Sequence, residues 1–197
     1  YTFGIKHTTA DNMTTMLQGS QVGPTPTFFF DYSVKDLRRD ITCCPFQWTK
    51  GVQTLQSFKS WSFGKLRYEW TNRMIPTGND DGINRQYMRY ADIVLMRAEL
   101  ENELNGASAA VPYLTKIRNR AFATSDRATE VTAYVAEAAL SKEKMFQAIV
   151  DERAYEFAGE LIRKADLIRW GMLKSKMDET KNKMKAIVSL TDYDSKH

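Results

Sequence analysis

If this sequence were an enzyme, its carboxylates could act as the acid pair of a glycosidase, in which two acidic groups lie about 5 or about 6.5–9.5 Å apart. Asp31, Glu69 and Asp80 are candidates, but nothing in their spacing selects a pair. The sequence contains no GxSxG, HExxH, P-loop or GxGxxG motif. These observations predict a protein that is not an enzyme.

Metal ligands are scarce in this sequence. It has two histidines, and its two cysteines, Cys43 and Cys44, are adjacent, so neither a zinc set nor a disulfide framework is expected. The cysteines are instead expected to be small buried thiols. Residues 77–82 (TGNDDG) resemble the start of a calcium loop, but an EF-hand would need acids where Thr77 and Met88 stand. A turn without metal is predicted there, with a looser calcium site as the alternative, and no cofactor is predicted.

The charge distribution does not favour a nucleic-acid partner. The formal net charge is +4, and the 28 basic and 24 acidic residues are interspersed. Lys65, Arg67 and Arg73 alternate with Tyr68 and Trp70 in the pattern that single strands require, but an acidic residue interrupts the run. No apolar run is long enough to form a membrane-spanning helix.

The sequence has two parts of different texture. Residues 1–82 are rich in aromatics, glycine, proline and threonine and predict loops with short strands, within the same domain as the rest. Residues 83–185 contain one proline, Pro112, and show helical periodicity. Residues 186–197 are expected to be a frayed end. Because the chain starts at Tyr1 without a methionine, we expect it to be a fragment of a larger protein.

Two aromatic runs in the first part are expected to be short strands. They are residues 27–32 (TFFFDY) and 60–70 (SWSFGKLRYEW). In the second run, alternation would place Leu66, Tyr68 and Trp70 on one face, where they would belong to the core.

A helix is predicted over residues 87–104, ending at Asn105 and Gly106. Its apolar face is expected to consist of Tyr87, Tyr90, Ala91, Val94, Leu95 and Ala98. Two ion pairs are expected along it, Arg89–Asp92 and Arg97–Glu101.

A second helix follows at once and predicts an antiparallel hairpin. Its apolar stripe is Ala110, Tyr113, Leu114, Ile117 and Ala121, and Pro112 is tolerable only near its first turn. Residues 122–140 predict a polar connector with a short helix. Three further helices are predicted: one capped by Ser141 and ending near Gly159, one from there to Gly171, and one over residues 173–185.

Three segments carry a family resemblance. MRYADIVLMRAELENEL, LTKIRNRA and AIVDERAYEFAGELIRKADLIRWG resemble, in order and spacing, signature segments of the SusD/RagB family, surface glycan-binding lipoproteins that partner TonB-dependent outer-membrane transporters. The resemblance covers about residues 83–172. One departure is Leu161, which stands where the family usually has glycine.

The resemblance implies a mostly α fold, in which tetratricopeptide-like helical hairpins form an α-α superhelix packed with an irregular, loop-rich layer of short strands. Helices in such a stack meet neighbours on two sides, so charges between them are expected to pair. Arg163 is expected to pair with Glu152 or Glu156. The expected structural network consists of Arg89, Asp92, Glu152, Arg153, Glu156, Glu160, Arg163, Asp166 and Arg169.

The resemblance also implies that a ligand is held by loop residues rather than by the signature helices. Sugars need flat aromatic faces and a few polar groups. The expected ligand-binding residues are Trp48, Trp61, Tyr68, Trp70, Arg73, Asn79 and Asp80. Trp48 and Trp61 are favoured, because each lies beside polar, loop-like sequence.

The implied function is non-catalytic binding of an oligosaccharide or related nutrient at the extracellular face of the outer membrane. The implied partner is a SusC-like TonB-dependent transporter, and the implied contact with the membrane is a lipid anchor on a part of the protein outside this sequence. The alternative is a tetratricopeptide-like protein–protein interaction scaffold without a sugar ligand.

Overall fold

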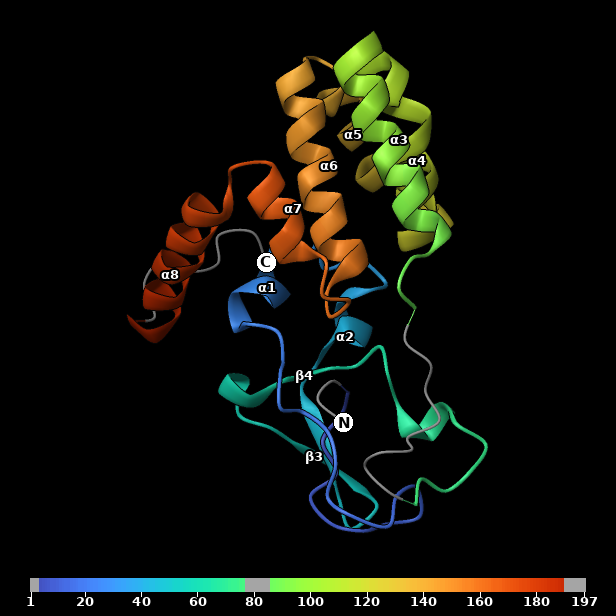
Figure 1. Ribbon diagram of the computed structural model, residues 1–197, viewed down its shortest axis with the longest axis vertical. Helices are drawn as coiled ribbons and strands as arrows, with labels where there is room; N and C mark the ends of the chain where they lie inside the picture. Colours follow the sequence, from blue (N-terminus) through green and yellow to red (C-terminus); the bar gives the residue numbers. More distant parts are fainter. Residues whose placement is uncertain (1–3, 77–85, 190–197) are drawn as a thin grey trace. The chain divides into compact units, whose positions relative to one another are not determined.

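The computed structural model describes residues 4–76 and 86–189, and most of them are helical, as predicted. The chain forms two compact units (Figure 1). The first unit comprises Tyr1–Ser33, Arg39–Asn84 and Ala158–His197, and the second comprises Val34–Arg38 and Arg85–Phe157. The helices that follow Phe157 therefore group with the loop-rich part of the sequence.

The second unit is built around a helical hairpin. Its elements are α3 (Tyr90–Asn105), α4 (Ala107–Ala121), η3 (Thr124–Asp126), the π-helical turn η4 (Ala128–Ala133), α5 (Tyr134–Ala138) and α6 (Lys142–Phe157). Gly106, with φ of +88°, is the single residue between α3 and α4, so the two helices pack antiparallel, with α6 beside them (Figure 1). The core contains Val94, Leu95, Leu114, Ile117, Val131, Met145, Ile149 and Val150.

The first helix is shorter than predicted. Helix α3 starts at Tyr90, so Tyr87 precedes it and is 98% exposed rather than part of the apolar face. Tyr90 is exposed as well, while Ala91, Val94, Leu95 and Ala98 are buried as expected. The predicted Arg89–Asp92 pair is wrong, because Arg89 lies before the helix and its side chain reaches Glu156 instead.

The other helix signals of this unit are confirmed with one correction. Pro112 lies in the second turn of α4 rather than the first, at an exposed position where the backbone carbonyl released by its missing N–H can face water. Ser141 caps α6 as predicted, because its Oγ accepts a hydrogen bond of 3.1 Å from the Lys144 N–H. Arg97 and Glu101 form the expected ion pair along α3.

The first unit contains two small antiparallel sheets. Strand β1 (Cys43–Cys44) pairs with β4 (Ser62–Phe63), and β2 (Phe46–Thr49) pairs with β3 (Val52–Leu55). Both cysteines are free and buried, as expected, and burial raises the pKa of the Cys43 thiol to about 12.

Three longer helices also belong to the first unit: α1 (Pro26–Asp31), α7 (Arg163–Arg169) and α8 (Leu173–Ser189). Its three single helical turns are α2 (Arg39–Thr42), η1 (Phe58–Ser60) and η2 (Tyr68–Trp70). The strand predicted over residues 27–32 is therefore wrong, because Pro26 starts a helix there. The strand predicted over 60–70 is confined to Ser62–Phe63, so Tyr68 is buried while Trp70 is exposed.

The turn that leads into α7 gives Leu161 a backbone conformation that glycine adopts more readily. Both Gly159 (φ +79°) and Leu161 (φ +68°) are in the left-handed region, so α7 starts at Arg163 and not near Gly159 as predicted. A Cβ on Gly159 would lie 3.0 Å from Cγ of Phe63, so glycine is needed there for space as well. Leucine at position 161 has no such backbone freedom and is strained.

Replacing Leu161 with glycine is therefore expected to raise the free energy of unfolding by about 1 kcal/mol. The side chain is largely exposed, so little buried apolar surface is lost. Urea unfolding followed by circular dichroism measures the change, and Leu140→Gly, at an exposed leucine without positive φ, is the control that should destabilise. A destabilised Leu161→Gly variant would show that the strain is absent.

Candidate functional site

Two groups of side chains are candidate sites, and the first is a pair of buried carboxylates in the second unit. Glu152 and Glu156 are four residues apart on α6, so they share one face of the helix. They are 0% and 3% exposed. Two buried like charges are unfavourable without cations close by, so their partners decide what the pair does.

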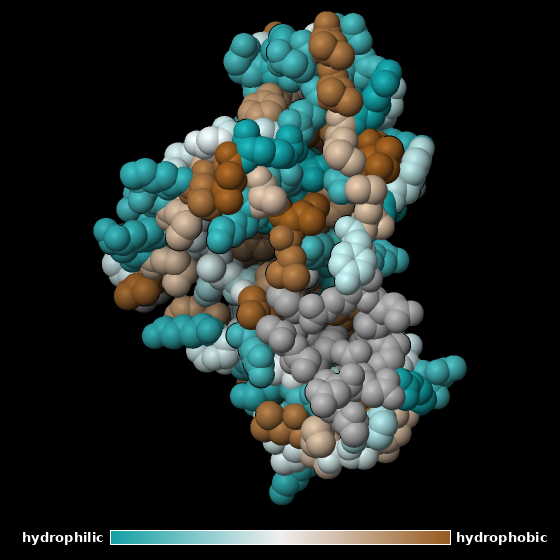
Figure 2. Space-filling model, viewed as in Figure 1, coloured by the Kyte–Doolittle hydropathy of each residue, from teal (hydrophilic) through white to brown (hydrophobic). Residues whose placement is uncertain are grey.

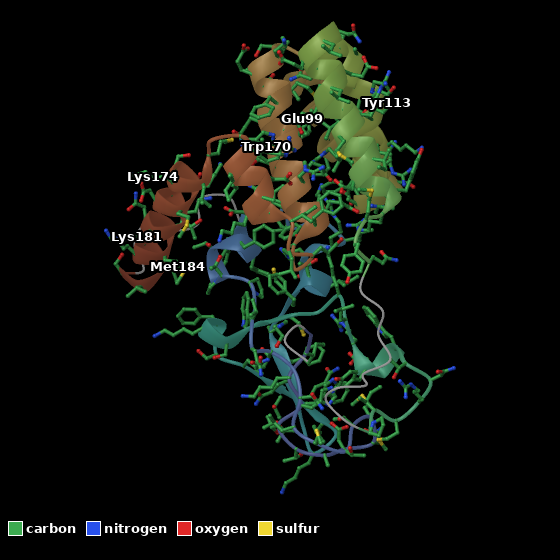
Figure 3. The ribbon with its side chains drawn as sticks, viewed as in Figure 1. Glu99, Tyr113, Trp170, Lys174, Lys181 and Met184 are labelled. Carbon is green, nitrogen blue, oxygen red and sulfur yellow. The ribbon has the colours of Figure 1, made fainter. Side chains whose placement is uncertain are left out.

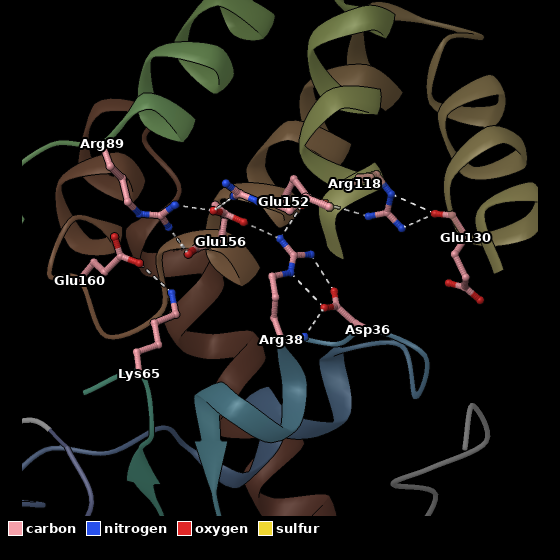
Figure 4. A network of polar contacts seen from close by, with 10 residues as sticks. Asp36, Arg38, Lys65, Arg89, Arg118, Glu130, Glu152, Glu156 and Glu160 are labelled. Atoms are coloured by element: carbon pink, nitrogen blue, oxygen red, sulfur yellow. Dashed lines mark hydrogen bonds and ion pairs between the residues drawn. The ribbon is translucent and has the colours of Figure 1, made fainter. Parts of the chain in front are cut away.

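Both oxygens of Glu152 are bound by arginine (Figure 4). Nη1 of Arg38 donates to Oε1 at 2.7 Å, and Nη1 of Arg118 donates to Oε2 at 2.8 Å. These charge-assisted hydrogen bonds tie α6 to α4 and to the segment Val34–Arg38.

Glu156 is bound by three arginines. Its Oε2 accepts from Nη1 of Arg38 at 2.9 Å, and its Oε1 accepts from Nη1 of Arg89 at 2.5 Å and from Nη2 of Arg120. Arg89 also donates to the backbone carbonyl of Glu156 at 2.6 Å. Burial raises the pKa of Glu156, but the hydrogen bond from Arg89 and the positive charges around it outweigh burial, so the pKa is lowered.

The arginines are themselves held in place. Asp36 Oδ1 and Oδ2 accept from Nε and Nη2 of Arg38 at 2.9 and 2.6 Å. Nε and Nη2 of Arg118 both donate to the backbone carbonyl of Glu130, at 3.0 and 2.6 Å, in the π-helical turn η4. The Arg118 guanidinium also lies 3.7 Å from the ring centroid of Tyr134.

This cluster, formed by Asp36, Arg38, Arg89, Arg118, Arg120, Glu152 and Glu156, joins four segments of the second unit. Its carboxylates are held by fixed cations, so they are poorly placed to transfer a proton or to accept a ligand hydroxyl. The arrangement is suited to holding the helices in register.

The remaining members of the predicted network pair in smaller groups. Within the second unit, Nη1 of Arg153 lies 2.8 Å from Oδ1 of Asp92. Within the first unit, Glu160 pairs with Lys65 at 2.7 Å, and Asp166 pairs with Arg169 at 2.9 Å. The pairing predicted for Arg163 would join the two units and stays a prediction.

Sequence reasoning missed the arginines that neutralise the carboxylates. Arg118 and Arg120 lie inside LTKIRNRA, so the alternation of basic residues in that helix was an available signal. Asp36 and Arg38 lie more than a hundred residues before Glu152, and no local pattern connects them to it.

The second group is an aromatic cluster in the first unit. Trp70 is the last residue of the short turn η2 and is 60% exposed. The Arg67 guanidinium lies 4.8 Å from the ring centroid of Trp70. Arg67 is fixed by a 2.6 Å hydrogen bond from its Nε to the Gly64 carbonyl. A rigid cation against one face leaves the rest of an exposed indole available for contact.

Trp48 lies next to this pair through Glu69. Its Nε1 donates to Oε2 of Glu69 at 3.2 Å, and its ring stacks on His7 at 6.2 Å. His7 is buried and its Nδ1 lies 2.7 Å from Oδ2 of Asp11. Trp48 is therefore half-buried and held from two sides.

The other predicted ligand-binding residues are dispersed. Tyr68 is buried, and Trp61 is half-buried with its ring edge-on to Phe29 at 5.1 Å. Arg73 is exposed, three residues after Trp70. Asn79 and Asp80, together with the predicted turn at 77–82, lie outside the described residues.

In the described part of the chain, no helix combines the length and apolar character needed to cross a membrane.

The described residues thus combine a helical hairpin, joined to α6 by buried arginine–glutamate pairs, with aromatic side chains on separate loops. The sequence model of the SusD family matches residues 49–196, so the chain belongs to the SusD family.

Two individual proteins are similar to this chain. The SusD-like protein P25 of Formosa agariphila is 48% identical over 90 residues, which are 46% of this chain and 16% of that protein. The crystal structure of a SusD homolog from Bacteroides thetaiotaomicron superimposes with a TM-score of 0.65 at 22% identity, over 75% of this chain and 32% of that one. The chain thus spans less than a third of the length of each relative, and the structural likeness supports the fold.

Proposed function

We propose that this chain is part of a non-catalytic cell-surface protein that binds an oligosaccharide or a related nutrient. The bound nutrient would pass to a SusC-like TonB-dependent transporter, and a lipid anchor elsewhere in the protein would hold it at the extracellular face of the outer membrane. Membership of the SusD family supports glycan or nutrient binding as the general role.

The observation that carries the proposal is the exposed indole of Trp70. Sugars present flat C–H faces that stack on aromatic rings, and the exposed indole of Trp70 offers such a ring. Arg67 holds the indole in one orientation, so little conformational entropy is lost on binding.

Polar groups beside Trp70 would fix the sugar hydroxyls. Glu69 is half-buried and can accept hydrogen bonds, and Arg73 can donate them. Trp48 and Trp61 remain proposed contacts.

The placement of the acidic residues supports the absence of catalysis. Asp31 is paired with Lys183 at 2.5 Å, and Glu69 accepts the hydrogen bond from Trp48. Glu152 and Glu156 are enclosed by arginines. A glycosidase needs one carboxylate as a proton donor and another as nucleophile or base, and Asp31, Glu152 and Glu156 are each bound by lysine or arginine.

Replacing Trp70 with alanine is expected to weaken sugar binding about tenfold, the loss of one aromatic stacking contact. Wild type is first titrated with starch, mannan, mucin-type and host glycans by calorimetry, and the variant is then titrated with the sugar that binds. Trp170→Phe is the matched control, because Trp170 lies in the same unit but outside the aromatic cluster.

Equal affinity of the Trp70→Ala variant and wild type would remove Trp70 from the site, and Trp48→Phe and Trp61→Phe would then locate the contact. If wild type binds none of these glycans in the calorimeter, sugar binding by this chain is contradicted.

A second candidate function is a protein-binding scaffold, and one observation favours it. Helix α3 exposes Tyr90, Ile93, Leu100 and Leu104. They are three, seven and four residues apart, so they lie on one side of the helix. An apolar stripe of this kind suits packing against another helix. Capture of a helical peptide by wild type but not by an Ile93→Glu variant would support the scaffold.

A further inference from the structure

Helix α8 has a net positive charge. It contains five lysines (Lys174, Lys176, Lys181, Lys183 and Lys185) and two acids (Asp178 and Glu179), a net charge of +3 against +4 for the whole sequence. It contains no arginine and no aromatic residue. Its charge is therefore concentrated in one cation type on one element.

The lysines fall into two sets on two sides of the helix. Lys183 is half-buried and pairs with Asp31 of α1 at 2.5 Å and with Glu179 at 2.9 Å. Lys176 also pairs with Glu179, at 2.9 Å. Lys183 therefore lies on the side of α8 that contacts α1, and Figure 3 shows Met184 on the side of α8 away from Lys174 and Lys181.

The other set lies on another side of α8 and is exposed. Lys174, Lys181 and Lys185 are separated by seven and four residues, so they line one face, and all three are exposed. Lys174 is compensated by Asp178 at 2.6 Å. Lys181 and Lys185 have no ion-pair partner among residues 4–76 and 86–189.

Apolar side chains border this lysine face. Met177 is 63% exposed and Val188 is 69% exposed, and helical spacing places both beside the lysines. In the described chain, no side chain of α8 is buried, although a helix of this length usually gains most of its stability from packing an apolar face. Figure 2 shows hydrophobic side chains among the hydrophilic ones over α8.

We propose that the lysine face of α8, formed by Lys174, Lys181 and Lys185, docks on an anionic, phosphate-bearing membrane surface. Lysines on a helix, with aliphatic side chains next to them, place their ammonium groups among phosphates while the apolar atoms enter the headgroup boundary. Protein interfaces are instead enriched in arginine, tyrosine and tryptophan and depleted in lysine, which argues against an acidic protein as the partner.

The contact would be a second attachment to the membrane, besides the lipid anchor of the proposed function. It depends on α8 alone, so a failure of vesicle binding would leave the sugar-binding proposal unchanged. Aligned along the surface, α8 would restrict the orientations that an anchored protein can adopt.

The test is co-sedimentation of the full chain with vesicles. Wild type should bind vesicles of phosphatidylcholine with 30% phosphatidylglycerol, and not vesicles of phosphatidylcholine alone. The double variant Lys181→Gln/Lys185→Gln should bind about 30-fold more weakly, since each lysine contributes about fivefold. The matched control is Lys50→Gln/Lys59→Gln, which removes the same charge at exposed positions of the first unit and should change binding less than threefold.

Met177→Gln separates a membrane from an acidic polymer. It should weaken binding to the anionic vesicles severalfold and leave binding to polyglutamate unchanged. Three outcomes would overturn the proposal: no binding of wild type to anionic vesicles, equal loss in the two double variants, or binding to polyglutamate at least as tight as to vesicles.

Discussion

Replacing Glu152 with glutamine is expected to lower the free energy of unfolding by about 3–5 kcal/mol. The amide keeps the shape of the side chain but removes the negative charge between Arg38 and Arg118. Arg118 is itself buried, so its guanidinium would be left with a carbonyl and aromatic rings but no counter-charge. Urea unfolding at pH 7, followed by circular dichroism, measures the change.

The control is Glu137→Gln, which breaks an ion pair with Lys144 that is exposed on both sides. That variant should lose less than about 1 kcal/mol. If both variants lose the same small amount, the buried pair does not stabilise the helices in the way proposed.

Replacing Arg118 with lysine is expected to cost about 2–3 kcal/mol, even though the positive charge is kept. Arg118 makes three hydrogen bonds in a fixed plane, two to the Glu130 carbonyl and one to Glu152. A lysine ammonium cannot reach both acceptors with this geometry, and it loses the planar stacking on Tyr134.

The same urea titration tests the prediction, with Arg97→Lys on the exposed side of α3 as control. Arg97→Lys should leave the unfolding midpoint unchanged. An Arg118→Lys variant as stable as wild type would mean that charge alone, and not the planar fork, holds η4 to α4.

The helical part was predictable because its signals are local. Periodic apolar residues and the Ser141 cap specify α3, α4 and α6 within a few residues. The start of α3 was placed three residues early, because Arg89 and the residues before it are compatible with a helix but Arg89 is drawn to Glu156. A tertiary ion pair of this kind leaves no trace in local sequence.

The candidate sites were predictable in composition but not in geometry. The acidic residues of the buried cluster were identified, while Arg38 and Asp36 were not, because their contacts join distant parts of the sequence. Among the aromatics, alternation predicted a strand that would bury Trp70 with Tyr68, but the short turn η2 places them in different environments. The secondary structure of such short aromatic runs depends more on the residues packed around them than on intrinsic strand propensity.

The separation of roles follows from these two sites. The charged signature residues hold α4, α6 and η4 together, and recognition is proposed for the exposed Trp70 of the first unit. The backbone at Leu161 is strained, because its φ is positive, and glycine at this position would relieve the strain.

A double-mutant cycle between Arg118 and Glu152 tests most directly whether a buried ion pair holds α6 to α4. The variants are Glu152→Gln, Arg118→Met and the double substitution, each measured by urea unfolding at pH 7. The double variant is predicted to lose at least about 1 kcal/mol less than the sum of the single losses. Losses that simply add would contradict the pairing of these two residues as the interaction that stabilises the fold.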